Sequence, residues 1–250
     1  MIFFRVIPFL LVENESCIKT IKFKKKVYLG DPINIVKIFS ELGVDEILIN
    51  DISLVDKPNF NLLKKIAEES FVPLSYGGGV KNLNDIEKIL SYGYEKICFN
   101  SLVFENYKFV EKAINEFGNS SISVSVNLKY NFFKNLKLFN KKKNEFYKDD
   151  VESHLKKINS LNPCETLLTF VDLEGTRKGY DKYLIDSFFK VIKTNMIVNG
   201  GAKDISDFKF LNKLGASGGV ASSLFSFKNN NESVLVNYLS QAEIDEINKI

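Results

Sequence analysis

Short apolar runs alternate with amphipathic stretches along most of the chain, and this alternation is its clearest structural signal. The apolar runs predict eight strands, at residues 3–12, 46–50, 72–76, 96–100, 122–128, 166–171, 196–199 and 219–223. Helical periodicity lies between most of them, at residues 33–42, 59–70, 83–92, 108–117, 149–161, 182–193 and 205–214, and a last helix is expected to begin near Glu232. Several of the runs are apolar throughout, which is typical of parallel strands buried on both faces.

This order of elements predicts an α/β fold, a single (β/α)8 barrel that spans residues 1–250. The apolar N-terminal run is interrupted by Arg5 and Pro8 and followed at once by Glu13, so it is better read as a buried strand than as a signal peptide. No stretch approaches 18 uninterrupted apolar residues, the length typical of a membrane span. We therefore expect a cytoplasmic protein with no membrane partner.

The sequence also repeats itself weakly at one spacing. Gly78 in a Gly-Gly-Gly run and Gly200 in an Asn-Gly-Gly run are 122 residues apart. Ser101 and Ser222, each at the end of an expected strand, are 121 residues apart. The repeat predicts a duplicated half-barrel with halves of roughly 1–120 and 121–250. No linker between the halves suggests two separate domains.

Small residues at the strand ends are candidate anion-binding groups. Glycine lets backbone N–H groups approach an anion, and loops after strands seven and eight of such barrels recurrently bind phosphate. The repeat therefore predicts two phosphate sites on opposite sides of the barrel opening at the carboxyl ends of the strands, the mouth. Two such sites suit a small ligand with phosphate at both ends. The residues expected at these sites are Gly78, Gly79, Asn100, Ser101, Gly200, Gly201, Ser222 and Ser223. The alternative is that the glycines only allow tight turns.

Charge and composition narrow the possible partners. The chain has 34 Lys and Arg against 31 Asp and Glu, a net charge of +3, which is too balanced to indicate nucleic-acid binding. The segment Lys129–Lys148 is basic and rich in aromatic residues, and it could be a nucleic-acid patch. We favour a long hairpin loop after the fifth strand with solvated lysines.

The few cysteines and the single histidine give little support to metal or redox chemistry. Cys17, Cys98 and Cys164 are widely spaced and form no Cys-x-x-Cys pair, so a disulfide framework and a zinc site are both poorly supported. His154 lies in a lysine-rich helical stretch and is expected at the surface. We expect no metal and no cofactor.

Several motifs together identify a family. The stretches are Arg5-Val6-Ile7-Pro8, Gly30-Asp31-Pro32, Gly43-Val44-Asp45-Glu46, Gly77-Gly78-Gly79, Lys96–Ser101, Asp172–Asp181 and Asn199-Gly200-Gly201-Ala202. With them the whole chain resembles the cyclase subunit of imidazole-glycerol-phosphate synthase, the (β/α)8 partner of a glutamine-hydrolysing subunit. The resemblance implies a heterodimer with a glutaminase and adds Gly175 and Thr176 to the phosphate-binding residues.

The resemblance also implies an acid and a base, two aspartates that face each other across the mouth. Here Leu11 and Asn127 stand at these positions. Leucine cannot exchange a proton and an amide is no base near neutral pH, so the chain is expected to have little cyclase activity. Asp172 and Glu174 are the possible substitutes, unless they only orient the turn at Gly175 and Thr176.

At the opposite end of the barrel, the resemblance implies a ring of charges that gates ammonia. All four positions match: Arg5, Glu46, Lys96 and Glu165. The alternative is a salt-bridge cluster with a structural role only. Asp45 and Glu95, beside the ring, could contact a docked glutaminase. Lys19 and the loop Lys22–Lys26 could reach an anionic ligand at the mouth or form a flexible lid.

Three further short motifs favour a divergent branch of this family. Leu10-Leu11-Val12, Lys19–Phe23 and Gly30–Asn34 resemble cyclase-like proteins of bacterial surface-polysaccharide clusters. That resemblance implies ammonia delivery to a sugar amidotransferase, which forms an acetamidino group on a sugar of lipopolysaccharide or flagellar glycan. One alternative is a working histidine-pathway cyclase that makes imidazole-glycerol phosphate. Another is a non-catalytic scaffold that activates the glutaminase by contact alone.

Overall fold

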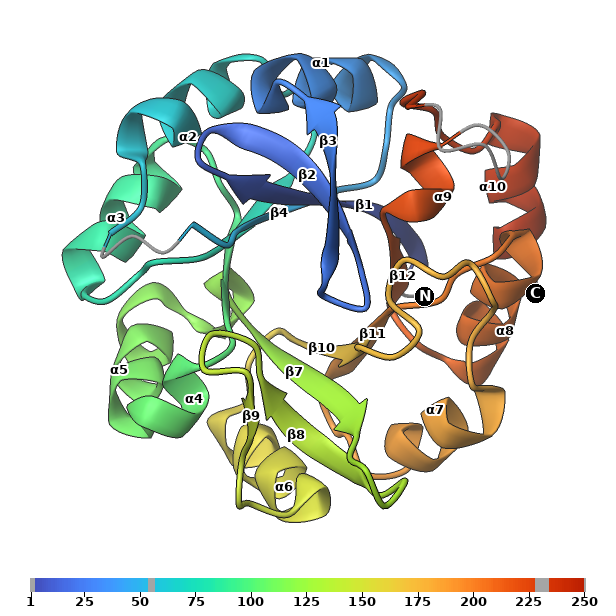
Figure 1. The fold of residues 1–250 in the computed structure, drawn as a ribbon. Helices are drawn as coiled ribbons and strands as arrows, with labels where there is room; N and C mark the ends of the chain where they lie inside the picture. Colours follow the sequence, from blue (N-terminus) through green and yellow to red (C-terminus); the bar gives the residue numbers. More distant parts are fainter. Residues whose placement is uncertain (1–2, 54–56, 228–233, 250) are drawn as a thin grey trace.

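The computed structural model describes residues 3–53, 57–227 and 234–249, and eight parallel strands form a closed barrel at its centre (Figure 1). In order around the barrel they are β1 (Arg5–Glu13), β4 (Ile47–Asp51), β5 (Leu74–Gly77), β6 (Lys96–Phe99), β7 (Ile122–Tyr130), β10 (Glu165–Phe170), β11 (Asn195–Asn199) and β12 (Gly218–Ala221). The last strand pairs with the first in parallel, Arg5 beside Gly218. The expected (β/α)8 barrel is confirmed.

A helix or a pair of helices follows each barrel strand and covers the outside. They are α1 (Pro32–Glu41), α2 (Phe60–Glu68), α3 (Leu83–Ser91), α4 (Leu102–Glu105), α5 (Tyr107–Phe117), α6 (Val151–Leu161), α7 (Lys182–Phe189), α8 (Ile205–Leu214), α9 (Ser223–Ser226) and α10 (Gln241–Asn248), with a 3-10 turn at Asn119–Ser121. Most begin where a short polar side chain accepts a hydrogen bond from the first turn, as Asp31 does from the Asn34 N–H at 2.9 Å. Among the described residues, no helix is long and apolar enough to cross a bilayer.

The last helix differs from the expectation. Its expected start, Glu232, lies outside the described residues, and the chain from Val234 to Leu239 is not helical. The helix begins after Ser240, which forms a reciprocal capping box with Glu243. The Ser-x-x-Glu pattern at this point was the sequence signal for the helix start.

Alternation along the strands divides the apolar side chains into two cores. Outward-facing residues such as Val6, Leu10 and Ile49 pack against the helices in the larger cluster. Inward-facing residues fill the barrel interior as a second cluster: Ile7, Phe9, Leu11, Ile18, Leu48, Leu167, Ile197 and Val220. This cluster, which we call the apolar column, lies between two polar ends, and buried polar side chains such as Ser123 and Thr169 share the interior with it.

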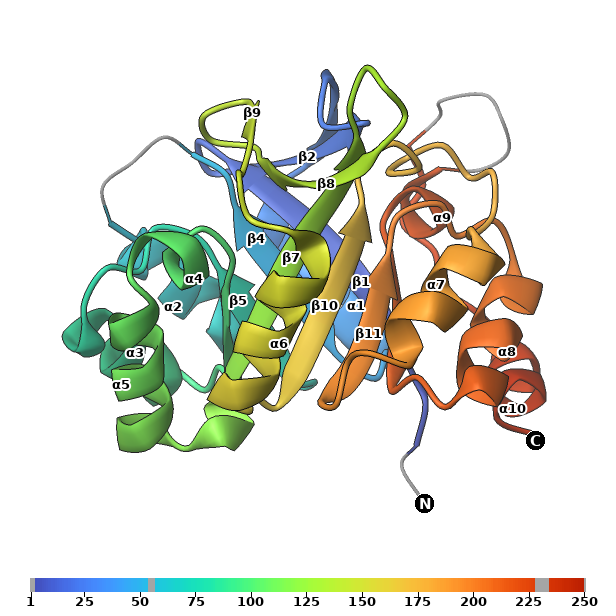
Figure 2. The ribbon, with the colours of Figure 1, turned by 90° about the horizontal axis from the view of Figure 1, so that it is seen from below.

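Two hairpins extend the barrel at the carboxyl ends of its strands, the end that we call the mouth. The first consists of β2 (Ser16–Ile21) and β3 (Lys25–Gly30), and β2 pairs antiparallel with the end of β1. The second consists of the extended end of β7 with β8 (Leu136–Asn140) and β9 (Glu145–Phe146). Figure 2 shows both hairpins at one end of the molecule and the N-terminus at the other. The hairpin expected within Lys129–Lys148 is therefore present.

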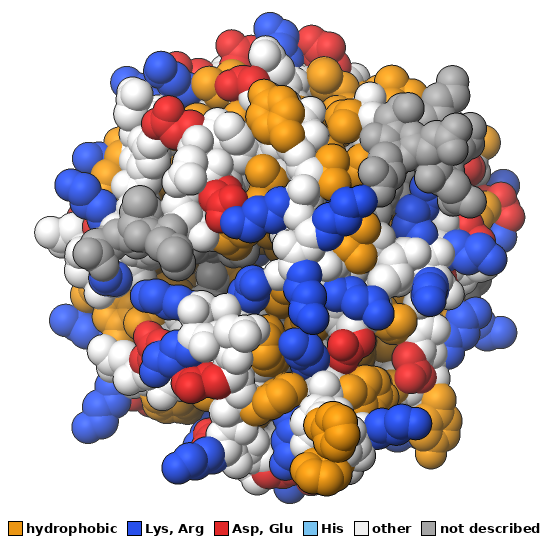
Figure 3. Space-filling view, in the orientation of Figure 1, with side chains coloured by type: hydrophobic (Ala, Val, Ile, Leu, Met, Phe, Trp, Pro, Cys, Tyr) orange, Lys and Arg blue, Asp and Glu red, His pale blue; other side chains and the backbone are white. Residues whose placement is uncertain are grey.

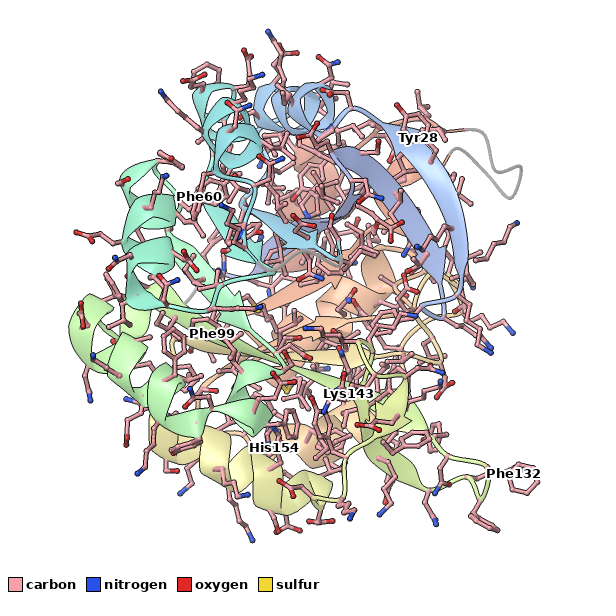
Figure 4. The ribbon with its side chains drawn as sticks, turned by 60° about the vertical axis from the view of Figure 1, so that its left-hand side comes forward. Tyr28, Phe60, Phe99, Phe132, Lys143 and His154 are labelled. Atoms are coloured by element: carbon pink, nitrogen blue, oxygen red, sulfur yellow. The ribbon has the colours of Figure 1, made fainter. Side chains whose placement is uncertain are left out.

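His154 is buried, so its expected surface position is wrong. It lies on the inner face of α6 with Leu155, Ile158 and Leu161, at helical spacing, and only 1% of it is exposed. Its ring stacks on Phe104 at 3.9 Å, and Tyr147 stacks on Phe104 at 3.6 Å (Figure 4 labels His154). This three-ring stack joins α4, α6 and the segment after β9. Burial lowers the pKa of His154 to about 4, and its Nε2 has no partner among the described residues.

Because the pKa of His154 is lowered, the free energy of unfolding depends on pH. In the unfolded chain a histidine binds a proton near pH 6.5, whereas the folded protein resists protonation of His154 down to about pH 4. Stability from this group is complete above pH 6.5 and falls as the pH drops toward 4, by up to about 3 kcal/mol. His154→Phe keeps a ring on Phe104 and removes the titration. Urea unfolding across this pH range should show a shallower loss for the variant, and equal slopes would contradict the assignment.

Candidate functional site

Four charged side chains form a closed ring at the amino-terminal ends of the barrel strands. Arg5 contacts Glu46 and Glu165, each at 2.5 Å. Lys96 Nζ lies 2.7 Å from Glu46 and 3.2 Å from Glu165. Each carboxylate therefore pairs with both cations, and Ser75 Oγ also donates to Glu46 at 2.5 Å. Arg5, Lys96 and Glu165 come from β1, β6 and β10, Glu46 directly precedes β4, and the barrel brings the four together as expected.

Burial makes this mutual pairing necessary. Glu46, Lys96 and Glu165 are each less than 9% exposed, and a buried charge without a partner is very costly. Burial acts to lower the pKa of Arg5, but Glu165 and Glu46 more than offset it, so the pKa is raised. The Arg5 side chain keeps 21% of its surface exposed, which leaves it in contact with solvent at the outer side of the ring.

The two acids expected beside the ring differ in their surroundings. Asp45 is half-buried, and its Oδ2 accepts a hydrogen bond from the Val6 N–H at 2.8 Å. Burial raises the pKa of Asp45, against that hydrogen bond and the nearby Arg5. Glu95 is exposed at the same end of the barrel. Asp45 thus has a structural contact already, whereas Glu95 is open to a partner.

At the mouth, no carboxylate occupies either of the two positions, Leu11 and Asn127, where the resemblance predicts an acid and a base. Leu11 on β1 is 4% exposed and belongs to the apolar column. Asn127 lies on β7, opposite β1 in the strand order. Its Nδ2 donates to Asn100 Oδ1 at 3.5 Å, and Asn100 Nδ2 donates to the Ser125 carbonyl at 2.8 Å. An apolar side chain and a small amide network therefore stand at these positions.

Glu174, a proposed substitute base, is instead the anchor of the first hairpin. It is 2% exposed and forms a buried ion pair with Lys19. Its Oε2 also accepts hydrogen bonds from Thr20 Oγ1 at 3.1 Å and from the Phe23 N–H at 3.0 Å. With these contacts Glu174 holds the hairpin over the mouth, and we call Lys19, Thr20, Phe23 and Glu174 the clasp.

Lys19 is therefore not a mobile loop residue. It is on β2, is 2% exposed and has its charge neutralised by Glu174. Burial lowers the pKa of Lys19, although Glu174 acts to raise it. Close packing supports the clasp, because a Cβ on Gly175 would meet the Thr20 carbonyl oxygen at 2.5 Å. The lysines of the turn beyond it, Lys22 and Lys24–Lys26, are exposed.

Asp172, the other proposed substitute, is half-exposed at the mouth. Its Oδ2 accepts a hydrogen bond from the Tyr130 N–H at 2.8 Å, which ties the turn after β10 to the end of β7. One of its oxygens is thus used in structure. Of the two candidate acids, Asp172 is the more accessible.

A hollow that is open to solvent lies beside the clasp in the second half of the barrel. Its lining includes most of the residues expected to bind phosphate there: Gly175, Gly200, Gly201, Ser222 and Ser223, with Lys19, Glu174 and Arg177. Ser222 is 7% exposed, and its Oγ has no partner among the described residues. The Thr176 hydroxyl donates to the Leu173 carbonyl at 2.7 Å and so stabilises its own turn.

The glycines also have a packing role that is the same in both halves. Gly78 and Gly200 have positive φ, 129° and 101°. A Cβ at Gly78 would meet the Asp51 carbonyl oxygen at 2.4 Å, and one at Gly200 would meet the Phe170 carbonyl oxygen at 2.6 Å. Gly79 and Gly201 have positive φ as well. Turn geometry alone accounts for these glycines, so phosphate binding at Gly78, Gly79, Asn100 and Ser101 stays a prediction.

Sequence reasoning missed the contact between the two hairpins. Lys141, in the turn between β8 and β9, donates through Nζ to the Phe23 carbonyl at 2.6 Å. The only signal for it was the high lysine content of both segments. Among the described residues, no three His, Cys, Asp or Glu side chains gather as metal ligands.

Comparisons with known proteins show one family throughout. A family model described as histidine biosynthesis protein matches residues 5–231. The chain is 37% identical over 244 residues to a Vibrio vulnificus protein named "Putative imidazole glycerol phosphate synthase subunit hisF3", covering 96% of this chain and 94% of the relative. It is 32% identical over 245 residues to a protein of Pseudomonas aeruginosa named likewise as subunit hisF2, covering 96% and 98%. It is 33% identical over 252 residues to the imidazole glycerol phosphate synthase subunit HisF of Clostridium botulinum, covering 96% and 97%.

The clasp can be tested by removing one of its charges. Lys19→Met leaves Glu174 buried without its cation, which should cost about 3–5 kcal/mol of unfolding free energy. Lys22 and Lys24–Lys26 are exposed already, and trypsin should cleave after them faster under native conditions once the hairpin is released. Lys64→Met is the matched control, because Lys64 pairs with Glu68 on the surface with both side chains 61% exposed. Denaturant unfolding and timed trypsin digestion measure the two effects, and a Lys19 variant as resistant as the control would contradict the clasp.

Proposed function

The chain belongs to the histidine biosynthesis protein family, together with HisF subunits of imidazole glycerol phosphate synthase, and from that premise we propose that it is the barrel subunit of a glutamine-dependent synthase. In this proposal a glutaminase subunit docks at the amino-terminal end of the barrel. Ammonia released there passes the ring of Arg5, Glu46, Lys96 and Glu165 and moves along the barrel interior. The exposed Glu95 is a candidate contact for that partner.

The apolar interior supports conduction of ammonia rather than ammonium. The column from Ile7 to Leu11 offers no charged side chain, and an ion in such surroundings pays a large desolvation cost. A neutral molecule pays far less. The ring supplies a polar entrance whose charges cancel one another, so a single side chain that swings outward can open it. Arg5 is suited to this because part of it already reaches solvent.

The side chains at the mouth favour one of two fates for the ammonia. They favour its delivery to another reaction and not its use in ring closure within this barrel. The single observation that carries this choice is the pair Leu11 and Asn127, an apolar column residue and a hydrogen-bonded amide. General acid–base help is worth about 10²–10⁴-fold, and neither side chain provides it at neutral pH. We propose that the ammonia serves acetamidino-sugar synthesis for a surface polysaccharide or flagellar glycan. A downstream sugar amidotransferase would consume it.

The hollow beside the clasp suits a phosphorylated small molecule. Backbone groups of Gly200 and Gly201 and the hydroxyls of Ser222 and Ser223 line it, together with Arg177. The buried Ser222 Oγ without a partner is the group best placed to bind a ligand oxygen. This proposal needs neither a metal nor a cofactor.

Synthesis of imidazole-glycerol phosphate in histidine biosynthesis is the second candidate function. The names of the relatives favour it, above all that of the Clostridium botulinum HisF subunit, because the match extends over 96% of the chain. This function needs a new proton-transfer group, and Asp172 is the accessible acid at the mouth. A third candidate is a scaffold that activates the glutaminase by contact alone, which the fully paired ring favours.

A cyclisation assay distinguishes the first two functions. The purified protein is mixed with the bisphosphorylated ribulosyl-amine substrate and ammonium salt, and imidazole-glycerol phosphate is measured. We expect at most about 10⁻² to 10⁻⁴ of a normal cyclase rate, since both acid–base groups are replaced. A normal rate that falls on Asp172→Asn would establish the histidine-pathway alternative and overturn the reading of Leu11 and Asn127.

The gate is tested with two nitrogen sources in the complex with the glutaminase. Lys96→Ala opens one side of the ring, so ammonia from the glutaminase should no longer be passed efficiently into the barrel. Formation of the synthase product should then fall with glutamine as the nitrogen source and be retained with added ammonium. Lys64→Ala, on the surface of α2, is the control for loss of a lysine. Equal losses with glutamine and with ammonium would assign the ring a purely structural role.

A further inference from the structure

The turn between β7 and β8 presents two phenylalanines to solvent. Phe132 is 94% exposed and Phe133 is 78% exposed, and their rings meet edge to face at 5.6 Å. Tyr130, at the base of the turn, is 42% exposed. Figure 4 shows Phe132 pointing away from the body of the molecule. These large apolar groups therefore form a protruding tip at the mouth.

The fold does not need phenylalanine at this tip. The turn is closed by polar groups, because Asn131 Oδ1 accepts from the Asn135 N–H at 2.9 Å and the Asn131 N–H donates to the Asn135 carbonyl at 2.9 Å. Lys134 takes the left-handed conformation, with φ of 60°, and its N–H donates to the Asn131 carbonyl. The two rings pack against each other and lie outside both cores. An exposed apolar tip of this kind is typical of a binding surface.

Two segments at the mouth carry a concentrated positive charge. Residues 129–148 contain seven lysines and one glutamate, and residues 22–26 contain four lysines. These two segments carry +10, so the remaining chain carries −7 to give the net charge of +3. The space-filling view shows the blue side chains gathered over the mouth (Figure 3). The near-neutral total hides a strongly basic face.

The lysines of the two hairpins lie close enough to repel one another. Lys141 reaches across to the Phe23 carbonyl, and its pKa is lowered by burial and then by Lys26 and Lys129. Glu13, on Lys26 at 2.6 Å, is an acid that offsets this cluster. Lysines held together at a cost in repulsion indicate an anionic partner.

In contrast to the sequence-based expectation of no membrane partner, we propose that the mouth docks on an anionic lipid surface, with Phe132 and Phe133 in the interfacial layer and the lysines of both hairpins on the headgroups. Aromatic side chains favour the membrane–water interface, and basic clusters bind anionic headgroups. The tip is convex, and a bilayer yields around a protrusion whereas a protein partner needs a matching pocket. The edge-to-face pair also offers no flat platform for stacking nucleobases.

This orientation leaves the amino-terminal end of the barrel free. The charged ring and Glu95 lie at the opposite end from the hairpins, as the positions of the N-terminus and the hairpins in Figure 2 indicate. A glutaminase and a membrane can therefore bind at the same time. The inference rests on the hairpins alone and does not depend on the proposed function.

Vesicle sedimentation of the full chain tests the proposal. The protein should pellet with vesicles of phosphatidylcholine mixed with phosphatidylglycerol and not with phosphatidylcholine alone, and added salt should weaken the binding. Phe132→Ser with Phe133→Ser should lower the affinity on the order of tenfold or more. Lys134→Glu with Lys137→Glu should lower it and reduce its salt dependence.

Matched controls use residues far from the mouth. Phe71→Ser removes an 85% exposed phenylalanine before β5, at the amino-terminal end of the barrel, and should leave binding unchanged. Lys64→Glu with Lys65→Glu on α2 should have little effect. Circular dichroism and thermal unfolding check that each variant is folded. Absence of binding to both vesicle types, equal binding by the Phe132 and Phe133 variant, or binding only to single-stranded RNA or an acidic protein would overturn the proposal.

Discussion

Buried carboxylates that must be paired organise both ends of this barrel. At the amino-terminal end, Glu46 and Glu165 share Arg5 and Lys96, so four strand ends are joined around one point. At the mouth, Glu174 requires Lys19, and that requirement brings an entire hairpin over the opening. Since an unpaired charge in these positions is far more costly than a lost surface contact, each pairing fixes long-range geometry. The same rule thus shapes the charged ring at one end and the hairpin cover at the other.

Between these ends the barrel contains an apolar column with little proton-transfer capacity. Leu11 continues the packing of Ile7 and Phe9 right up to the mouth, and Asn127 is bound to Asn100. In the proposed function, this barrel passes a small neutral molecule and holds an anion at its rim. Under that proposal, any bond formation would depend on Asp172 or on groups from another protein.

The strands and the ring could be predicted because their signals are local or shared with a family. Apolar runs located all eight barrel strands, and Arg5, Glu46, Lys96 and Glu165 were assigned by resemblance and lie together. Lys19 was read as a loop residue, since its partner Glu174 is 155 residues away in the sequence. His154 was placed at the surface because neighbouring lysines masked its position on the inner face of α6.

The contacts of Glu174 also bear on how quickly anything can enter. The hollow is lined by Lys19 and Glu174 themselves, and the hairpin that they hold lies over the mouth. A ligand too large for the present opening has to wait until thermal motion lifts this hairpin. Its association rate would then reach a ceiling at high ligand concentration, set by the spontaneous opening frequency and steeply dependent on temperature. The Lys19–Glu174 ion pair would thus limit both the size of the ligand that enters and the rate at which it enters.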